Sequence, residues 1–144
     1  MTFTTRLDHG QRLAVFHWKD TLSQYDLNQN LHVLRALDFP AHYDLIHLFD
    51  EEIDVQIDHN NIVAHAIERQ RTLQERDITH QLRSAFVAAP ASLKLLVEIW
   101  PLFFPETDQS LLIRIFDTLD EALDWLGRAP FDETTLEAYP LREV

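Results

Sequence analysis

The residues best suited to chemistry form a dense cluster of histidines and carboxylates around position 50. Its members are His47, Asp50, Glu51, Glu52, Asp54, Asp58 and His59. Imidazole and carboxylate groups bind zinc, manganese and similar metal ions. Their spacing here, however, matches neither the HExxH pattern nor the EF-hand loop. A solvated acidic loop explains the same residues, and we therefore predict no metal site.

A second group of candidate residues comes from the predicted strands, each of which carries a polar residue in an apolar run. These residues are His17, His47, Arg83 or Ser84, and Arg114. Side chains alternate between the faces of a sheet, so the group could gather on one face away from the helices. Two histidines and an arginine brought together in this way would bind an anion or transfer a proton. A half-solvated sheet face, or half of a dimer interface, is the alternative explanation.

Catalysis has little other support in the sequence. A reaction that used His47 and Arg114 together requires both side chains to point to the same face of the sheet. The serines at positions 23, 84, 92 and 110 lack the strand-to-helix context of an activated nucleophile. We therefore predict no catalytic residue and no cofactor, and an enzyme is the less favoured class.

The third candidate is the apolar segment at 92–104, which we predict to be a helix. Only Lys94 and Glu98 are charged in it, so apolar side chains surround the helix on all sides. Such a helix is buried on more than one side, whereas the core of a small domain covers only one. The large residues that need a cover are Trp100, Phe103 and Phe104. We expect a second copy of the chain to provide it, with the C-terminal tail and an apolar, lipid-like ligand as alternatives.

Composition excludes several classes of function. The chain has 144 residues, which suits one domain, and it has no Cys, which excludes disulfides and thiolate chemistry. Only two Gly are present, so no glycine-rich phosphate loop can form. A formal charge of −12 opposes binding to nucleic acid. We see no signal peptide and no apolar run of about twenty residues, so we expect a cytoplasmic protein without membrane insertion.

The elements that position these residues follow from hydrophobic periodicity and from turn residues. We predict strands at 3–8, 12–18, 44–49, 82–89 and 111–116, of which the fourth has its buried apolar run at 85–89. We predict helices at 23–38, 58–73, 92–104 and 118–127, and a short exposed strand or extended loop at 53–57. The order is β-β-α-β-α-β-α-β-α. It predicts a single α/β domain with a mixed, mostly parallel sheet and an N-terminal β-hairpin. The strands at 85–89 and 111–116 should lie side by side in the same direction.

The second half of the chain carries the most specific phrases. SAFVAAP precedes the apolar helix, and RIFDTLDEALDWLG leads from a strand into the last helix. Thr118 and Glu121 predict a capping box at the start of that helix, and Gly127 predicts its end. With the element order over residues 3 to 128, these phrases resemble the SpoIIAA-like branch of the STAS superfamily, small cytoplasmic proteins that include many uncharacterised bacterial members. We accordingly divide the chain into a STAS-like domain at 1–128 and an acidic C-terminal tail at 129–144.

The resemblance implies a regulatory or protein-interaction role without catalysis. In the regulatory antagonists of this superfamily, a partner kinase phosphorylates a Ser at the start of the second helix. The corresponding place here is 57–61, which contains no Ser or Thr, so we predict no phospho-switch. Asp58 lies near this place, as a fixed negative charge or as an ordinary helix cap.

Two functions remain open from the sequence. The first is a non-enzymatic, homodimeric protein-interaction or regulatory domain. The alternative is a binding module for a small apolar or anionic ligand, held in a pocket beneath the third helix or on the His/Arg face of the sheet.

Overall fold

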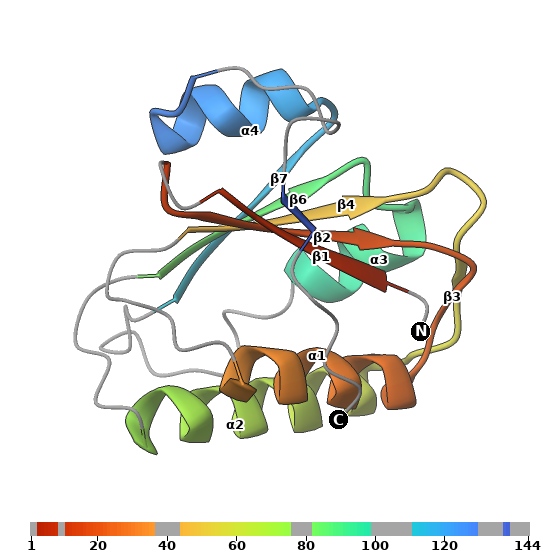
Figure 1. Cartoon of the computed structure of the whole chain (residues 1–144). Helices are drawn as coiled ribbons and strands as arrows, with labels where there is room; N and C mark the ends of the chain where they lie inside the picture. Colours follow the sequence, from red (N-terminus) through yellow and green to blue (C-terminus); the bar gives the residue numbers. More distant parts are fainter. Residues whose placement is uncertain are drawn as a thin grey trace.

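The computed structural model describes residues 3–8, 11–36, 44–75, 82–98, 111–129 and 137–138. Within them the elements are β1 (Phe3–Asp8), β2 (Leu13–Trp18), β3 (Thr21–Leu22), α1 (Gln24–Ala36), β4 (Asp44–Phe49), β5 (Asp54–Val55), α2 (His59–Glu75), β6 (Leu82–Val87), α3 (Ala91–Glu98), β7 (Leu111–Phe116), α4 (Leu119–Leu126) and β8 (Glu137–Ala138). Figure 1 shows their arrangement around one central sheet.

The central sheet has the strand order β7-β6-β4-β2-β1-β8. Strands β2, β4, β6 and β7 are parallel neighbours, whereas β1 runs antiparallel to both β2 and β8. The predicted α/β class with a mixed, mostly parallel sheet is therefore confirmed. The predicted side-by-side, same-direction pairing of the strands near 85–89 and 111–116 is confirmed as well, because β6 pairs with β7 in parallel from Leu82↔Leu111 to Val87↔Phe116.

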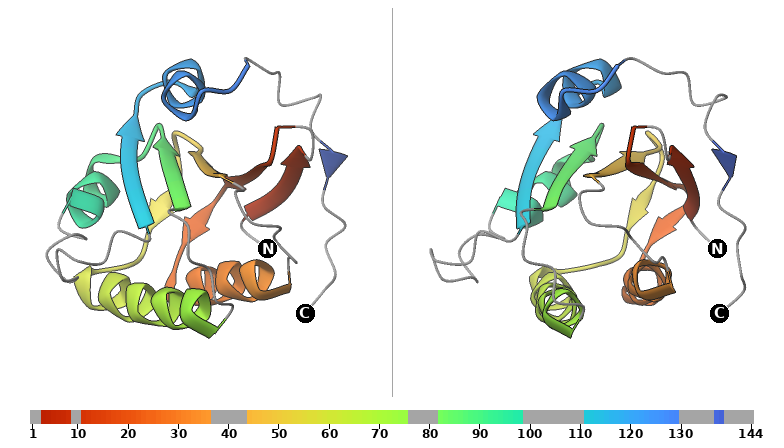
Figure 2. Two further views of the ribbon diagram at one scale, coloured as in Figure 1. Left: turned by 90° about the vertical axis from the view of Figure 1, so that its left-hand side faces the viewer. Right: turned by 60° about the vertical axis from the view of Figure 1, so that its left-hand side comes forward.

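Helices cover both faces of the sheet, as Figure 2 shows. Helices α1, α2 and α3 lie on one face. Buried residues of α1 and α3 join those of the strands in one core that includes Phe16, Leu27 and Leu93, and Ile62 of α2 packs in a smaller cluster beside it. Helix α4 lies on the other face, where Leu123 and Leu126 pack against Val15, Ile46 and Ala85 among others. A central parallel strand covered on both faces is buried along its whole length, as all six residues of β4 are. Four of them are apolar, and the two polar ones, Asp44 and His47, both have hydrogen-bond partners.

Local sequence determines the two ends of α4. The Thr118 hydroxyl accepts a hydrogen bond from the Glu121 backbone N–H at 3.3 Å and donates one to the Glu121 carboxylate at 3.0 Å. Gly127 ends the helix in the left-handed conformation, with φ of 67°. Glycine adopts this conformation without the steric cost that other residues meet. The predicted start and end of this helix are confirmed.

The structure refines three predicted elements. The strand expected to begin at Leu82 and to run through the apolar residues 85–89 is observed at Leu82–Val87, so its start is confirmed and its end comes two residues earlier. The short exposed strand or extended loop expected at 53–57 is confirmed as a strand, with the two residues of β5 paired in parallel with β3. Helix α3 is described only to Glu98. In this part apolar side chains lie on both its inner and its outer side, but only the inner one is buried in the single chain, since Leu93 is 2% exposed and Leu95 is 66% exposed.

The residues Trp100, Phe103 and Phe104 lie outside the described residues. Of the segment 129–144, Glu137 and Ala138 form β8 and pair with β1. Among the helices that the structure describes, none is long and apolar enough to cross a membrane.

Candidate functional site

His47 lies at the centre of an aromatic row on the sheet face that α1, α2 and α3 cover. The register pairs Phe16 with His47 and His47 with Phe86 across three neighbouring strands. The ring centroid of His47 lies 5.2 Å from that of Phe16 and 4.8 Å from that of Phe86. His47 is only 3% exposed, so it belongs to the interior and not to a solvated sheet face.

A hydrogen bond from Trp18 determines the tautomer of His47. The Trp18 indole N–H donates to His47 Nδ1 at 3.1 Å. Because Nδ1 accepts this hydrogen bond, the neutral imidazole carries its proton on Nε2. The indole also finds the partner that a buried tryptophan usually needs.

A small pocket lies between this aromatic row and the three helices. Trp18, His47 and Phe86 line it from the sheet, and Asn30, His65 and Leu93 line it from α1, α2 and α3. Its volume is about 30 Å³. Most of the remaining lining is Leu, Ile and Phe, and the described lining contains no Asp, Glu, Lys or Arg. Small-molecule sites share this mostly apolar lining with a few polar groups, but at about 300–1,000 Å³ they are much larger.

Asn30 is the unusual residue of the pocket. It is 1% exposed, and its side-chain Nδ2 has no hydrogen-bond partner among the described residues. A buried amide N–H without a partner costs about 1–3 kcal/mol of stability. An oxygen atom in the pocket, from water or from a ligand, would remove this cost. The site can therefore donate a hydrogen bond to a guest in a mostly apolar surrounding.

The structure does not bring His17, His47 and Arg114 together. His17 and Arg114 lie on the α4 face, where Arg114 sits over the Trp125 ring at 5.4 Å, whereas His47 lies on the opposite face. His17 and Arg114 are also three strands apart in the sheet, which is about 14 Å. The expected gathering on one face is wrong, as is a catalytic pairing of His47 with Arg114, because residue parity in the paired strands separates them.

His17 has another polar neighbour at the end of the sheet. Its Nε2 lies 2.6 Å from the Asp50 carboxylate, and the two side chains are 23% and 43% exposed. Ion pairs at this level of exposure contribute about 0–1 kcal/mol. This pair joins the ends of β2 and β4 and involves no other member of the predicted site.

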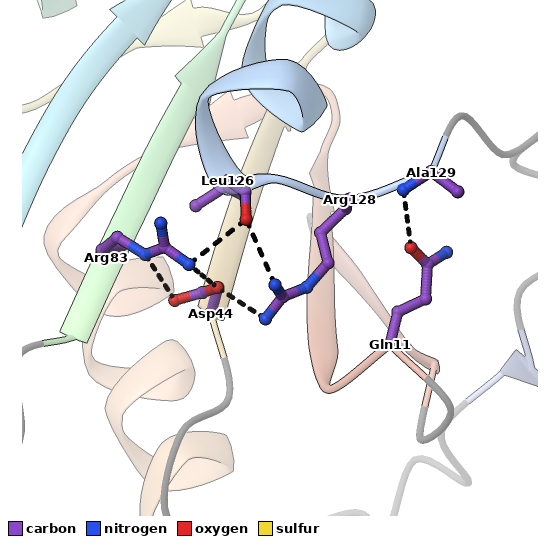
Figure 3. A network of polar contacts seen from close by, with 6 residues as sticks. All are labelled: Gln11, Asp44, Arg83, Leu126, Arg128 and Ala129. Carbon is purple, nitrogen blue, oxygen red and sulfur yellow. Dashed lines mark hydrogen bonds and ion pairs between the residues drawn. The ribbon is translucent and has the colours of Figure 1, made fainter.

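Arg83 belongs to a polar network on the α4 face, shown in Figure 3. The Asp44 carboxylate accepts hydrogen bonds from Arg83 Nε and Nη2, at 3.2 and 2.7 Å, and from Arg128 Nη2 at 2.9 Å. Both arginines also donate to the backbone carbonyl of Leu126, at 3.3 and 3.1 Å. Cations are favourable at this end of a helix because of its dipole. The network attaches α4 to β4 and β6, which is a structural role.

The acidic cluster around position 50 is dispersed in the structure. Glu51, Glu52 and Asp54 are exposed, and His47 points into the core. Among the residues that the structure describes, no group of three or more His, Asp or Glu is placed to hold a metal ion. Asp58 caps α2, since its carboxylate accepts from the Asn61 backbone N–H at 3.0 Å and Asn61 Oδ1 accepts from the Asp58 N–H at 2.8 Å. An ordinary cap therefore accounts for Asp58.

Sequence reasoning missed Asn30 and Trp18. Asn30 lies three residues after Leu27 and just before Leu31, on the apolar stripe of α1. A polar residue on the core-facing stripe of a helix was the signal that could have identified it.

By its fold, the chain is an α/β protein with a mixed, mostly parallel sheet, helices on both faces and a small pocket beneath three of them. In comparisons with known proteins, no family model, no curated protein and no solved structure matches the chain.

Proposed function

We propose that the chain is a STAS-like domain of the SpoIIAA-like kind, which acts in the cytoplasm by binding and not by catalysis. The order of the described elements supports this proposal: an antiparallel pair of strands, β1 and β2, precedes strands and helices that alternate through α4. The proposed fold includes the N-terminal β-hairpin and the order β-β-α-β-α-β-α-β-α. Because 57–61 contains no Ser or Thr, its regulation would not use the phospho-switch.

The lead function is that of a homodimeric protein-interaction or regulatory domain. The observation that carries it is Leu95, which is 66% exposed on the side of α3 away from the core. Leu95 lies in the same apolar segment, 92–104, as Trp100, Phe103 and Phe104. Leu95 and these residues are close in sequence, and contiguous exposed apolar surface is typical of protein interfaces. A symmetric dimer would use the same segment of both copies.

Light scattering coupled to size exclusion tests this function. We expect the wild-type chain to have the mass of a dimer and Leu95→Glu to have the mass of a monomer. Burying one Leu is worth about 1.5–3 kcal/mol, and the change removes it from both copies, so Kd should rise a hundredfold or more. Tyr25→Glu is the matched control, since Tyr25 is also 66% exposed but lies on α1. A monomeric wild-type chain would contradict the dimer.

The second candidate is a binding module for a small molecule. The pocket between the sheet and α3 favours it, because Asn30 Nδ2 has no partner there among the described residues. The described lining contains no cation, so it supports an uncharged ligand over an anionic one. Native mass spectrometry of the purified chain should detect a bound small molecule that Asn30→Leu removes.

A further inference from the structure

We propose that the pocket between β2, β4, β6 and helices α1 to α3 binds a small neutral carbonyl compound whose oxygen accepts a hydrogen bond from Asn30 Nδ2. This inference rests on the second function proposed above and specifies its ligand class. The cavity, the buried Asn30 donor and the chemistry of the lining each support it.

The polar groups of the pocket select an acceptor. Asn30 Nδ2 is a donor without a partner among the described residues. His47 Nδ1, an acceptor in the lining, is already occupied by the Trp18 indole at 3.1 Å. A guest that brings an oxygen acceptor and no hydrogen to donate therefore satisfies Asn30 and leaves no new polar group unpaired. A ketone or an ester meets this condition.

A carbonyl group uses the lining more fully than water does. A buried water makes about three hydrogen bonds, and its two hydrogens need acceptors. Seven of the eleven lining residues are Leu, Ile or Phe and offer none, which leaves the Asn30 amide oxygen and the His65 ring as the further groups of the lining that can accept. A carbonyl compound instead places its alkyl groups against the Leu, Ile and Phe side chains, where burial of apolar surface is favourable.

The charge and size of the guest follow from the same lining. An anion would lose its hydration without any described Lys or Arg to replace it, which is costly in an apolar cavity. The volume of about 30 Å³ holds about two waters, whereas a cavity of about 150 Å³ binds benzene. The part of the guest that enters is therefore no more than its carbonyl group and one neighbouring carbon, and the rest of the guest stays at the mouth of the pocket, which is not fully enclosed. Acetone is a suitable probe.

The test is a titration of the isotope-labelled full chain with acetone, followed by ¹H–¹⁵N NMR. We expect saturable shifts of the Asn30 side-chain amide and of the Trp18 indole N–H. Asn30→Ala removes the hydrogen-bond donor and enlarges the cavity. Binding driven by the hydrogen bond and binding driven by cavity volume therefore predict opposite changes in acetone affinity. Binding through the hydrogen bond should become about tenfold weaker, as seen at the Trp18 indole. Binding driven by cavity volume alone would become tighter and would overturn the proposal.

Two further variants keep the result unambiguous. Asn28→Ala changes an exposed Asn two residues away on the same helix and should leave acetone binding unchanged. Asn30→Leu fills the pocket and should abolish the shifts even if Asn30→Ala fails to fold. An absence of saturable shifts in the wild-type chain would show that the pocket holds water only and would overturn the proposal. The oligomeric state is measured separately, so this failure is distinguishable from failure of the dimer.

Discussion

The two faces of the central sheet differ in whether their buried polar groups have hydrogen-bond partners. On the α4 face, the buried carboxylate of Asp44 receives three hydrogen bonds from two arginines, which also bind the last carbonyl of the helix. On the face covered by α1, α2 and α3, the buried amide of Asn30 faces a cavity, and its Nδ2 has no partner among the described residues. The first arrangement stabilises the fold, whereas the second leaves a polar group available to a guest.

The packing of apolar side chains also differs between the two faces of the sheet. Ala122, Leu123 and Leu126 of α4 are each 1% exposed or less and fill the space above the sheet. Leu93 of α3 is also buried, at 2% exposed, but it borders the pocket. Protein interiors are normally close-packed, so a cavity beside a buried leucine is a local weakness. We infer that the face with the pocket serves binding and the α4 face serves stability.

A matched pair of leucine substitutions tests this difference most strongly. Leu123→Ala should lower the free energy of unfolding by about 4 kcal/mol, because the space it leaves adds a new cavity to a filled core. Leu93→Ala should cost about 2–3 kcal/mol, because Leu93 already lacks contacts on its pocket side. Urea denaturation of both variants measures the two values. Equal losses, or a larger loss for Leu93→Ala, would contradict the inferred division.

The polar network of the α4 face gives the next largest effect. Asp44→Ala should destabilise the chain by about 2–3 kcal/mol, because Arg83 and Arg128 then lose a partner that is only 6% exposed. The arginines are 32% and 22% exposed and regain some hydration, which keeps the loss below that of a fully buried pair. Thermal or urea unfolding measures the change.

A control and a double mutant complete this test. Asp54→Ala removes an exposed carboxylate and should change stability by less than about 0.5 kcal/mol. Combining Asp44→Ala with Arg83→Ala should cost clearly less than the sum of the two single changes, since both remove the same interaction. Simple additivity would mean that the network does not hold α4 in place.

Much of the fold was predictable from local pattern. The apolar run at 44–49 indicated the strand β4, and Thr118 and Gly127 indicated both ends of α4. The end of β6 was less predictable. The apolar run continues through Ala88 and Ala89, but the strand ends at Val87, and Ala88 has a φ of 58°. The Ala88 backbone N–H donates to the Phe116 carbonyl at the end of β7, at 2.9 Å, so a contact distant in sequence accompanies this end.

The candidate site was less accessible to sequence reasoning. His17 and His47 lie at adjacent rows of neighbouring strands, since His47 pairs with Phe16 and His17 pairs with Leu48. A shift of one residue in this register would have put both histidines on the same face, and nothing local determines the register. The position of Asn30 on the apolar stripe of α1 can be seen in the sequence. The cavity beside it cannot, because it forms only where three helices pack on the sheet.

The smallest expected effect is a gain of stability on the pocket face. Asn30→Leu should raise the free energy of unfolding by about 1 kcal/mol, because it replaces an unpaired buried amide with an apolar group beside existing space. Asn28→Leu, at an exposed site of the same helix, separates this gain from any change in helix propensity. Thermal unfolding of both variants in the absence of ligand gives the comparison.

Whether Asn30→Leu raises or lowers the free energy of unfolding distinguishes a binding role of Asn30 from a structural role. A residue whose replacement stabilises the free protein and abolishes acetone binding is retained for binding at a cost in stability, as functional sites commonly are. No such gain is expected on the α4 face, where Asp44 is already paired. If Asn30→Leu instead destabilised the chain by 1 kcal/mol or more, Asn30 would be a structural residue, and the two faces would no longer differ in purpose.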